Sequence, residues 1–144
     1  MSMDGQAWSG PLDPLDIVYC HFPDEGPLIP APKPRPALVL NVNDGESPLH
    51  VQIAYGTSRK TLDKYSGEFT IGPDDGAVFI QTGLTVATKF DLARLVWLPY
   101  DSHWFKPRTG AGASKTPKLG YLDAGKTLSI RRRFEASARA AGLI

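Results

Sequence analysis

Short apolar runs separated by turn residues dominate the first two thirds of the chain. Four of these runs are rich in β-branched and aromatic residues, which is typical of strands: residues 15–22, 37–42, 68–71 and 93–98. Residues 49–55 instead alternate apolar and polar side chains with a period of two, which predicts a half-buried strand. Because the turn signal Asn43-Asp-Gly45 separates 37–42 from 49–55, we expect these two runs to form an antiparallel hairpin.

Three further segments complete the predicted set of elements. Residues 77–81 are apolar and are predicted to form one more short strand. Residues 123–141 are the one helical candidate, with Asp123 as a plausible N-cap and Gly142 as the stop signal. Six prolines lie between residues 23 and 36, and this segment is expected to be an extended loop because proline has no N–H for a strand ladder.

Short strands, frequent turns and one terminal helix indicate a mostly β (α+β) fold. We expect a small, strongly bent antiparallel sheet or barrel with the helix packed on it. The length of 144 residues suits a single domain, which we place at 15–144 after a flexible N-terminal lead-in of residues 1–14. Residues 106–118 contain no large apolar side chain and are predicted to be a mobile loop.

Composition bears on whether the chain spans a membrane, is secreted, or resides in a reducing compartment. No apolar run approaches 18 residues, so no membrane span is expected, and residues 1–10 lack the pattern of a secretory signal. Cys20 is the only cysteine, which excludes an internal disulfide and fits a reducing, cytoplasmic location. We expect Cys20 to be a buried structural thiol.

The net charge of +1 conceals a gradient along the chain. Residues 1–32 hold five acids and no Lys or Arg, residues 33–100 hold seven charges of each sign, and residues 101–144 hold nine bases and three acids. A net charge of +1 does not indicate a strongly basic, non-specific nucleic-acid binder. Any case for nucleic-acid binding therefore depends on where the cations lie.

Two patterns that could indicate a cofactor are interpreted as structural. Gly110–Thr116 resembles a phosphate-binding loop, but Ser114 stands where the motif requires a glycine before the lysine, and no strand leads directly into it. The three histidines, His21, His50 and His103, are too far apart in sequence to suggest a metal site. We therefore expect no metal and no cofactor.

One constellation of residues indicates phosphate chemistry. Pairing of the two hairpin strands would put Arg35, at the start of the first, beside Thr57 and Ser58, after the end of the second. Arginine suits bidentate contact with phosphate, and hydroxyls add further donors. Lys33, Arg59 and Lys60 would surround this group. The alternative interpretation is a loop arginine beside ordinary turn residues.

Several segments resemble the PemK/MazF family of toxin–antitoxin ribonucleases. The similar segments lie in the family's order: Asp16–Phe22, Arg35–Leu40, the strand ending in Thr57-Ser58, Gly83–Lys89, and Leu119–Leu122 before the last helix. The resemblance implies an SH3-like barrel, a homodimer, and metal-independent, sequence-specific cleavage of single-stranded RNA that leaves a 2′,3′-cyclic phosphate. It also implies an antitoxin protein that occupies the RNA groove.

The resemblance carries over residue by residue only in part. Arg35 matches the family's catalytic arginine, and Thr57, with Ser58 beside it, matches the strand-end hydroxyl that holds the scissile phosphate. Lys89 ends the Gly83 segment and is expected to contact RNA with Lys33, Arg59 and Lys60. The Arg-x-Asp pair of some members is missing from residues 78–82, and the first loop contains no histidine, so the general base is unassigned.

Two other functions remain open on the sequence alone. The first is a non-catalytic binding protein on the same barrel, either a CcdB-like poison of DNA gyrase or a protein inhibitor or regulator. The second is a general nucleic-acid-binding barrel, for which binding without cleavage would depend steeply on salt.

Overall fold

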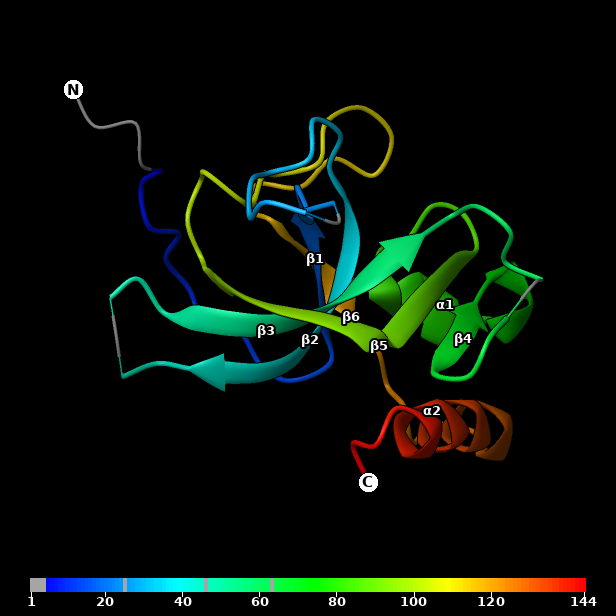
Figure 1. Ribbon diagram of the computed structural model, residues 1–144. Coiled ribbons are helices and arrows are strands. Elements are labelled where there is room, and N and C mark those ends of the chain that lie inside the picture. The colour runs from blue at the N-terminus through cyan, green and yellow to red at the C-terminus, as the bar shows by residue number, and fades with distance from the viewer. Residues whose placement is uncertain (1–4, 25, 46, 63) are drawn as a thin grey trace.

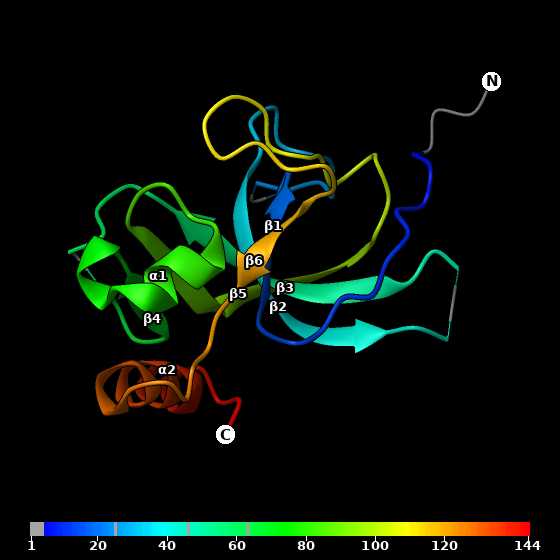
Figure 2. The same cartoon turned by 180° about the vertical axis from the view of Figure 1, so that it is seen from behind.

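Six strands form one curled antiparallel sheet in the computed structural model, which describes residues 5–24, 26–45, 47–62 and 64–144. The strand order is β4-β5-β3-β2-β1-β6. The strands are β1 (Asp16–Cys20), β2 (Arg35–Asn43), β3 (His50–Thr57), β4 (Glu68–Ile71), β5 (Thr88–Pro99) and β6 (Lys118–Tyr121). Figures 1 and 2 show how strongly the sheet bends, which confirms the predicted mostly β, antiparallel architecture.

Three helical elements complete the fold. They are the 3-10 turn η1 (Pro73–Asp75), helix α1 (Ala77–Thr82) and the C-terminal helix α2 (Leu128–Ala140). In the described part of the chain, none of these helices has the length and apolar character needed to cross a bilayer.

Both faces of the central strands are covered by core side chains. Ile17 and Val18 are neighbours on β1 and point to opposite faces, yet each is fully buried in a different cluster. Register shifts between β1 and β6, β2 and β3, and β3 and β5 bend the sheet around these clusters. Burial on both faces explains why β1 and β2 read as continuous apolar runs rather than alternating ones.

The described part of the N-terminal lead-in lies against the first of these clusters. Leu12 is buried in it, and Trp8 packs on its edge while donating its Nε1–H to the carbonyl of Phe105 at 3.0 Å. Ala7 forms an isolated bridge with Asp101. The expected flexible segment thus contributes side chains to the core.

Helix α2 covers the second cluster. Phe69 on β4 forms ring contacts with Phe90 on β5 and Phe134 on α2, at centroid distances of 5.8 and 5.6 Å. The helix begins later than predicted, because the hydroxyl of Thr127, rather than the carboxylate of Asp123, caps it by accepting the N–H of Ile130 at 3.2 Å. The predicted end at Gly142 agrees with the last helical residue, Ala140.

The predicted strand at residues 77–81 is wrong, because this segment forms helix α1. A short apolar run does not distinguish a strand from a helix by periodicity alone. Val78 and Thr82 are buried at helical spacing, and Ile80 is 77% exposed. Gly83 ends the helix in the left-handed conformation, with a φ of 73°. Most of the segment Leu119–Leu122, expected to lead into the last helix, belongs to the edge strand β6 (Lys118–Tyr121), which pairs with β1.

Two long loops lie side by side at the end of β1 (Figures 1 and 2). The proline-rich loop before β2 is held by the ring of His21, whose Nδ1 lies 2.7 Å from the carbonyl oxygen of Ala31. The loop before β6 is held on Tyr19, whose backbone N–H donates to Pro117 and whose carbonyl accepts from Lys106. The space between these loops and the end of β3 is where the candidate site lies.

Candidate functional site

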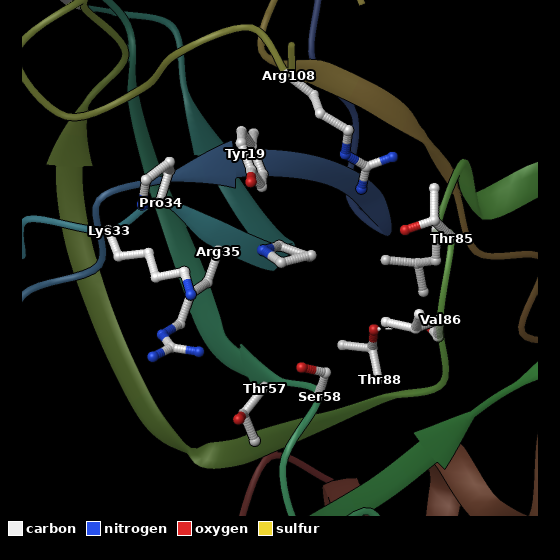
Figure 3. A pocket seen from close by; sticks show the side chains of 12 residues that line it. Tyr19, Lys33, Pro34, Arg35, Thr57, Ser58, Thr85, Val86, Thr88 and Arg108 are labelled. Atoms are coloured by element: carbon white, nitrogen blue, oxygen red, sulfur yellow. Dashed lines mark hydrogen bonds between the residues drawn. The ribbon is translucent and has the colours of Figure 1, made fainter. Parts of the chain in front are cut away.

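A cavity of about 180 Å³ opens where the end of β1, the start of β2 and the end of β3 meet the segment 84–88. Its wall carries three cations: Lys33, Arg35 and Arg108. It also carries five hydroxyl groups: Tyr19, Thr57, Ser58, Thr85 and Thr88. Figure 3 shows these side chains arranged around the opening, with Tyr19 and Arg108 across from Thr57 and Ser58.

Strand pairing brings Arg35 and the two hydroxyl residues together. Strands β2 and β3 form the predicted antiparallel hairpin, and Ala37 pairs with Tyr55. Continuing that register by two residues places Arg35 across from Thr57. Arg35 is also paired with Cys20 on its other side, so strands flank its backbone on both sides. The hairpin therefore sets the position of a half-buried guanidinium beside two hydroxyls.

The turn after β3 orients the hydroxyl of Thr57. Its Oγ1 accepts the backbone N–H of Arg59 at 3.1 Å. Because this hydroxyl acts as an acceptor toward the backbone, its own hydrogen remains available for donation to a ligand. Ser58 is exposed at the cavity and adds a second hydroxyl.

Three of the predicted RNA-binding residues do not line the cavity. Arg59 and Lys60 are exposed on the turn that follows β3. Lys89 is only 7% exposed; its Nζ lies 3.3 Å from Glu68 Oε1 and donates to the carbonyl of Lys60 at 3.1 Å. Its ammonium is thus held inside the protein. Of the four predicted RNA-binding residues, Lys33 is the one at the cavity.

Four polar residues at the cavity were not singled out from the sequence: Tyr19, Thr85, Thr88 and Arg108. Tyr19 precedes Cys20 on β1, and alternation along a strand places the two side chains on opposite faces. This alternation is the one sequence signal that could have identified Tyr19. Arg108 lies in the segment predicted to be a mobile loop and has no local signal, because only the return of that loop onto β1 brings it to the site.

The electrostatics of the wall suit an anion. No Asp, Glu or His lines the cavity among the described residues, so three cations face it without an acidic neighbour in the lining. Burial raises the pKa of the nearby Cys20 thiol well above its ordinary value, because a thiolate would be desolvated there. Cys20 is therefore not suited to act as a nucleophile.

No family model matches this sequence, and a search of curated proteins finds no similar chain. The case for a function therefore depends on the side chains that the fold gathers at this cavity.

Proposed function

We propose that this chain is a metal-independent endoribonuclease toxin of the PemK/MazF type, with an SH3-like barrel fold. The observation that carries this proposal is the meeting of Arg35 with Thr57 and Ser58 at one cavity, through the pairing of β2 with β3. A guanidinium and hydroxyl donors are the groups that bind and polarise a phosphodiester.

In this mechanism the ribose 2′-oxygen forms a bond to the adjacent phosphorus and its proton passes to water. The bond from phosphorus to the 5′-oxygen breaks, that oxygen takes up a proton, and a 2′,3′-cyclic phosphate forms. Arg35 donates to the phosphate oxygens on which negative charge builds, as a stabiliser of the transition state or as the proton donor to the leaving oxygen. Thr57 and Ser58 donate to the phosphate and hold it in place. Lys33 raises the local concentration of the anionic strand.

The partners follow from the same proposal. The substrate is single-stranded RNA, the active form is a homodimer in the cytoplasm, and an antitoxin protein blocks the groove. The basic C-terminal third, with nine cations against three acids, suits contact with an acidic antitoxin.

The test uses end-labelled single-stranded RNA of varied sequence, incubated in a chelator. Wild type is expected to cut at defined sites, and Arg35→Ala is expected to be slower by roughly 10²–10³-fold, as for loss of one donor to a charged transition state. Arg132→Ala, which removes an exposed arginine from α2, is the matched control and should cut like wild type. RNA that stays intact with wild type, or equal cutting by Arg35→Ala, would contradict the proposal.

One observation favours a second function, a non-catalytic binding protein on the same fold. The described lining of the cavity offers neither a carboxylate nor an imidazole to accept the proton of the 2′-hydroxyl. A CcdB-like poison of DNA gyrase or a protein inhibitor would need no such base. A stoichiometric protein partner without any RNA turnover would support this alternative, whereas chelator-resistant cleavage would exclude it.

A further inference from the structure

Arg108 is a buried cation that the loop of residues 106–117 brings to the cavity. Arg108 is only 8% exposed, and its Nη1 donates to the carbonyl of Gly83 at 2.6 Å. Its guanidinium carbon lies 5.4 Å from the centroid of the Tyr19 ring. Figure 3 shows the group on the wall facing Ser58, so its remaining donors border the cavity.

No carboxylate balances this charge in the described part of the chain. The ion pairs found there join Lys89 to Glu68, Lys118 to Asp16 and Arg133 to Asp75. A guanidinium has five N–H donors, and one carbonyl satisfies few of them. Because a buried cation without a counter-ion is costly, an anion in the cavity would supply both the missing charge and the missing acceptors.

The loop is built to hold Arg108 in this place. The Oγ of Ser114 accepts the backbone N–H of Arg108 at 3.0 Å, and the N–H of Ser114 donates back to the carbonyl of Arg108 at 3.0 Å. Gly112 has a φ of +71°, and a Cβ on it would come within 2.7 Å of Nη1 of Arg108. The positive φ therefore favours a glycine where the loop passes the guanidinium.

We infer that Arg108 is a second phosphate-binding residue, facing Arg35 across the cavity, and that the 106–117 loop exists to supply it. This inference rests on the proposed function in one respect, that the cavity receives a phosphodiester of a single-stranded nucleic acid. The glycine-rich segment around Gly110 then serves phosphate binding by seating an arginine, not by cradling a phosphate with backbone amides.

Binding to a strand that cannot be cut tests this inference apart from catalysis. The probe is a short, mixed-sequence single-stranded DNA, which lacks the attacking 2′-hydroxyl. Arg108→Gln is expected to weaken its binding roughly tenfold or more, since a hydrogen bond to a charged group is lost. It should also reduce the slope of log K against log salt by about 0.7, the value for one phosphate contact on a single strand. Lys115→Gln removes an exposed cation from the same loop and should bind like wild type.

A second readout guards against a variant that is merely misfolded. Inorganic phosphate, compared with chloride at equal ionic strength, is expected to raise the Tm of wild type and of Lys115→Gln by more than that of Arg108→Gln. An equal phosphate-dependent rise in wild type and Arg108→Gln would overturn the inference, and so would equal DNA affinity.

The two proposals fail in different ways. If wild type leaves RNA intact but binds phosphate and DNA, and Arg108→Gln binds both more weakly, the nuclease proposal fails and this inference stands. If RNA is cut and Arg108→Gln binds and cuts like wild type, this inference fails and the nuclease proposal stands.

Discussion

Gly56 on β3 lies against the carbonyl of Pro36 on β2, so closely that a Cβ on Gly56 would come within 2.2 Å of the Pro36 oxygen and 3.0 Å of the Phe90 ring. In the register of β2 and β3, this Pro36–Gly56 pair is next to the pair formed by Arg35 and Thr57. The absence of a side chain at Gly56 is therefore what lets the start of β2 and the end of β3 converge on the cavity.

Gly56→Ala is expected to lower the free energy of unfolding by about 2 kcal/mol, because the added methyl group meets backbone that is paired on both sides. It should also impair RNA cleavage and DNA binding at temperatures where the variant is folded, since Arg35 and Thr57 are pushed apart. Chemical denaturation measures the change in stability, and the RNA-cleavage and DNA-binding assays measure the change at the cavity. Gly45→Ala is the control, because its Cβ would meet only Asn43 Oδ1 at 3.3 Å; equal effects of the two substitutions would refute the explanation.

Lys89 and Lys33 are expected to act on different properties. Lys89→Ala removes the partner of Glu68, a carboxylate whose side chain is 13% exposed, and should lower the free energy of unfolding by about 3 kcal/mol. Lys33 is exposed at the cavity, so Lys33→Ala should leave stability within about 0.5 kcal/mol of wild type while weakening RNA binding. Urea titrations and filter binding separate the two. Normal stability of Lys89→Ala with lost RNA binding would restore Lys89 as an RNA contact.

The ion pair between Asp75 and Arg133 fastens α2 to η1 and should make part of the stability depend on pH. Partial burial of the Asp75 carboxyl opposes its ionisation, but hydrogen bonds from Arg133 and from the N–H of Gly72, with the charge of Arg133, outweigh this and lower its pKa below the usual value. A carboxyl with a lowered folded-state pKa stabilises the protein above its unfolded-state pKa, near 4, and this contribution is lost as the pH falls through the folded-state value.

Asp75→Asn is therefore expected to cost about 2 kcal/mol at neutral pH, since it removes hydrogen bonds to a charged partner. The difference from wild type should shrink progressively below pH of about 4. Thermal unfolding of both proteins across this range measures it. Asp74→Asn, at an exposed neighbouring position, is the control and should show little difference at any pH. A pH-independent gap for Asp75→Asn would contradict the assignment.

The thiol of Cys20 should be inert in the folded protein. The residue is fully buried, and burial raises its pKa well above the ordinary value, so almost no thiolate exists near neutral pH. Reaction with a disulfide reagent at pH 8 is expected to proceed only at the rate of unfolding and to become fast in denaturant. Rapid stoichiometric labelling without denaturant would show that Cys20 is accessible after all.

Much of the fold was predictable because its signals are local. The hairpin of β2 and β3 follows from two apolar runs around a turn, and α2 follows from a helical stretch that ends before Gly142. The strand predicted at residues 77–81 is wrong because five residues are too few for a period to decide between strand and helix, and only the burial of Val78 and Thr82 decides it.

The contacts made within one hairpin could be predicted from the sequence. Arg35 lies near Thr57 and Ser58 because two strands joined by a short turn pair with each other. The number of residues between them then fixes which residues face one another. The contacts between segments distant in sequence could be established only from the folded chain. In the folded chain Lys89 forms an ion pair with Glu68, and the guanidinium of Arg108 lies near the ring of Tyr19. A charged side chain carries no local sign of whether the fold will bury it beside a carboxylate or leave it facing a cavity, because that depends on which segments pack around it.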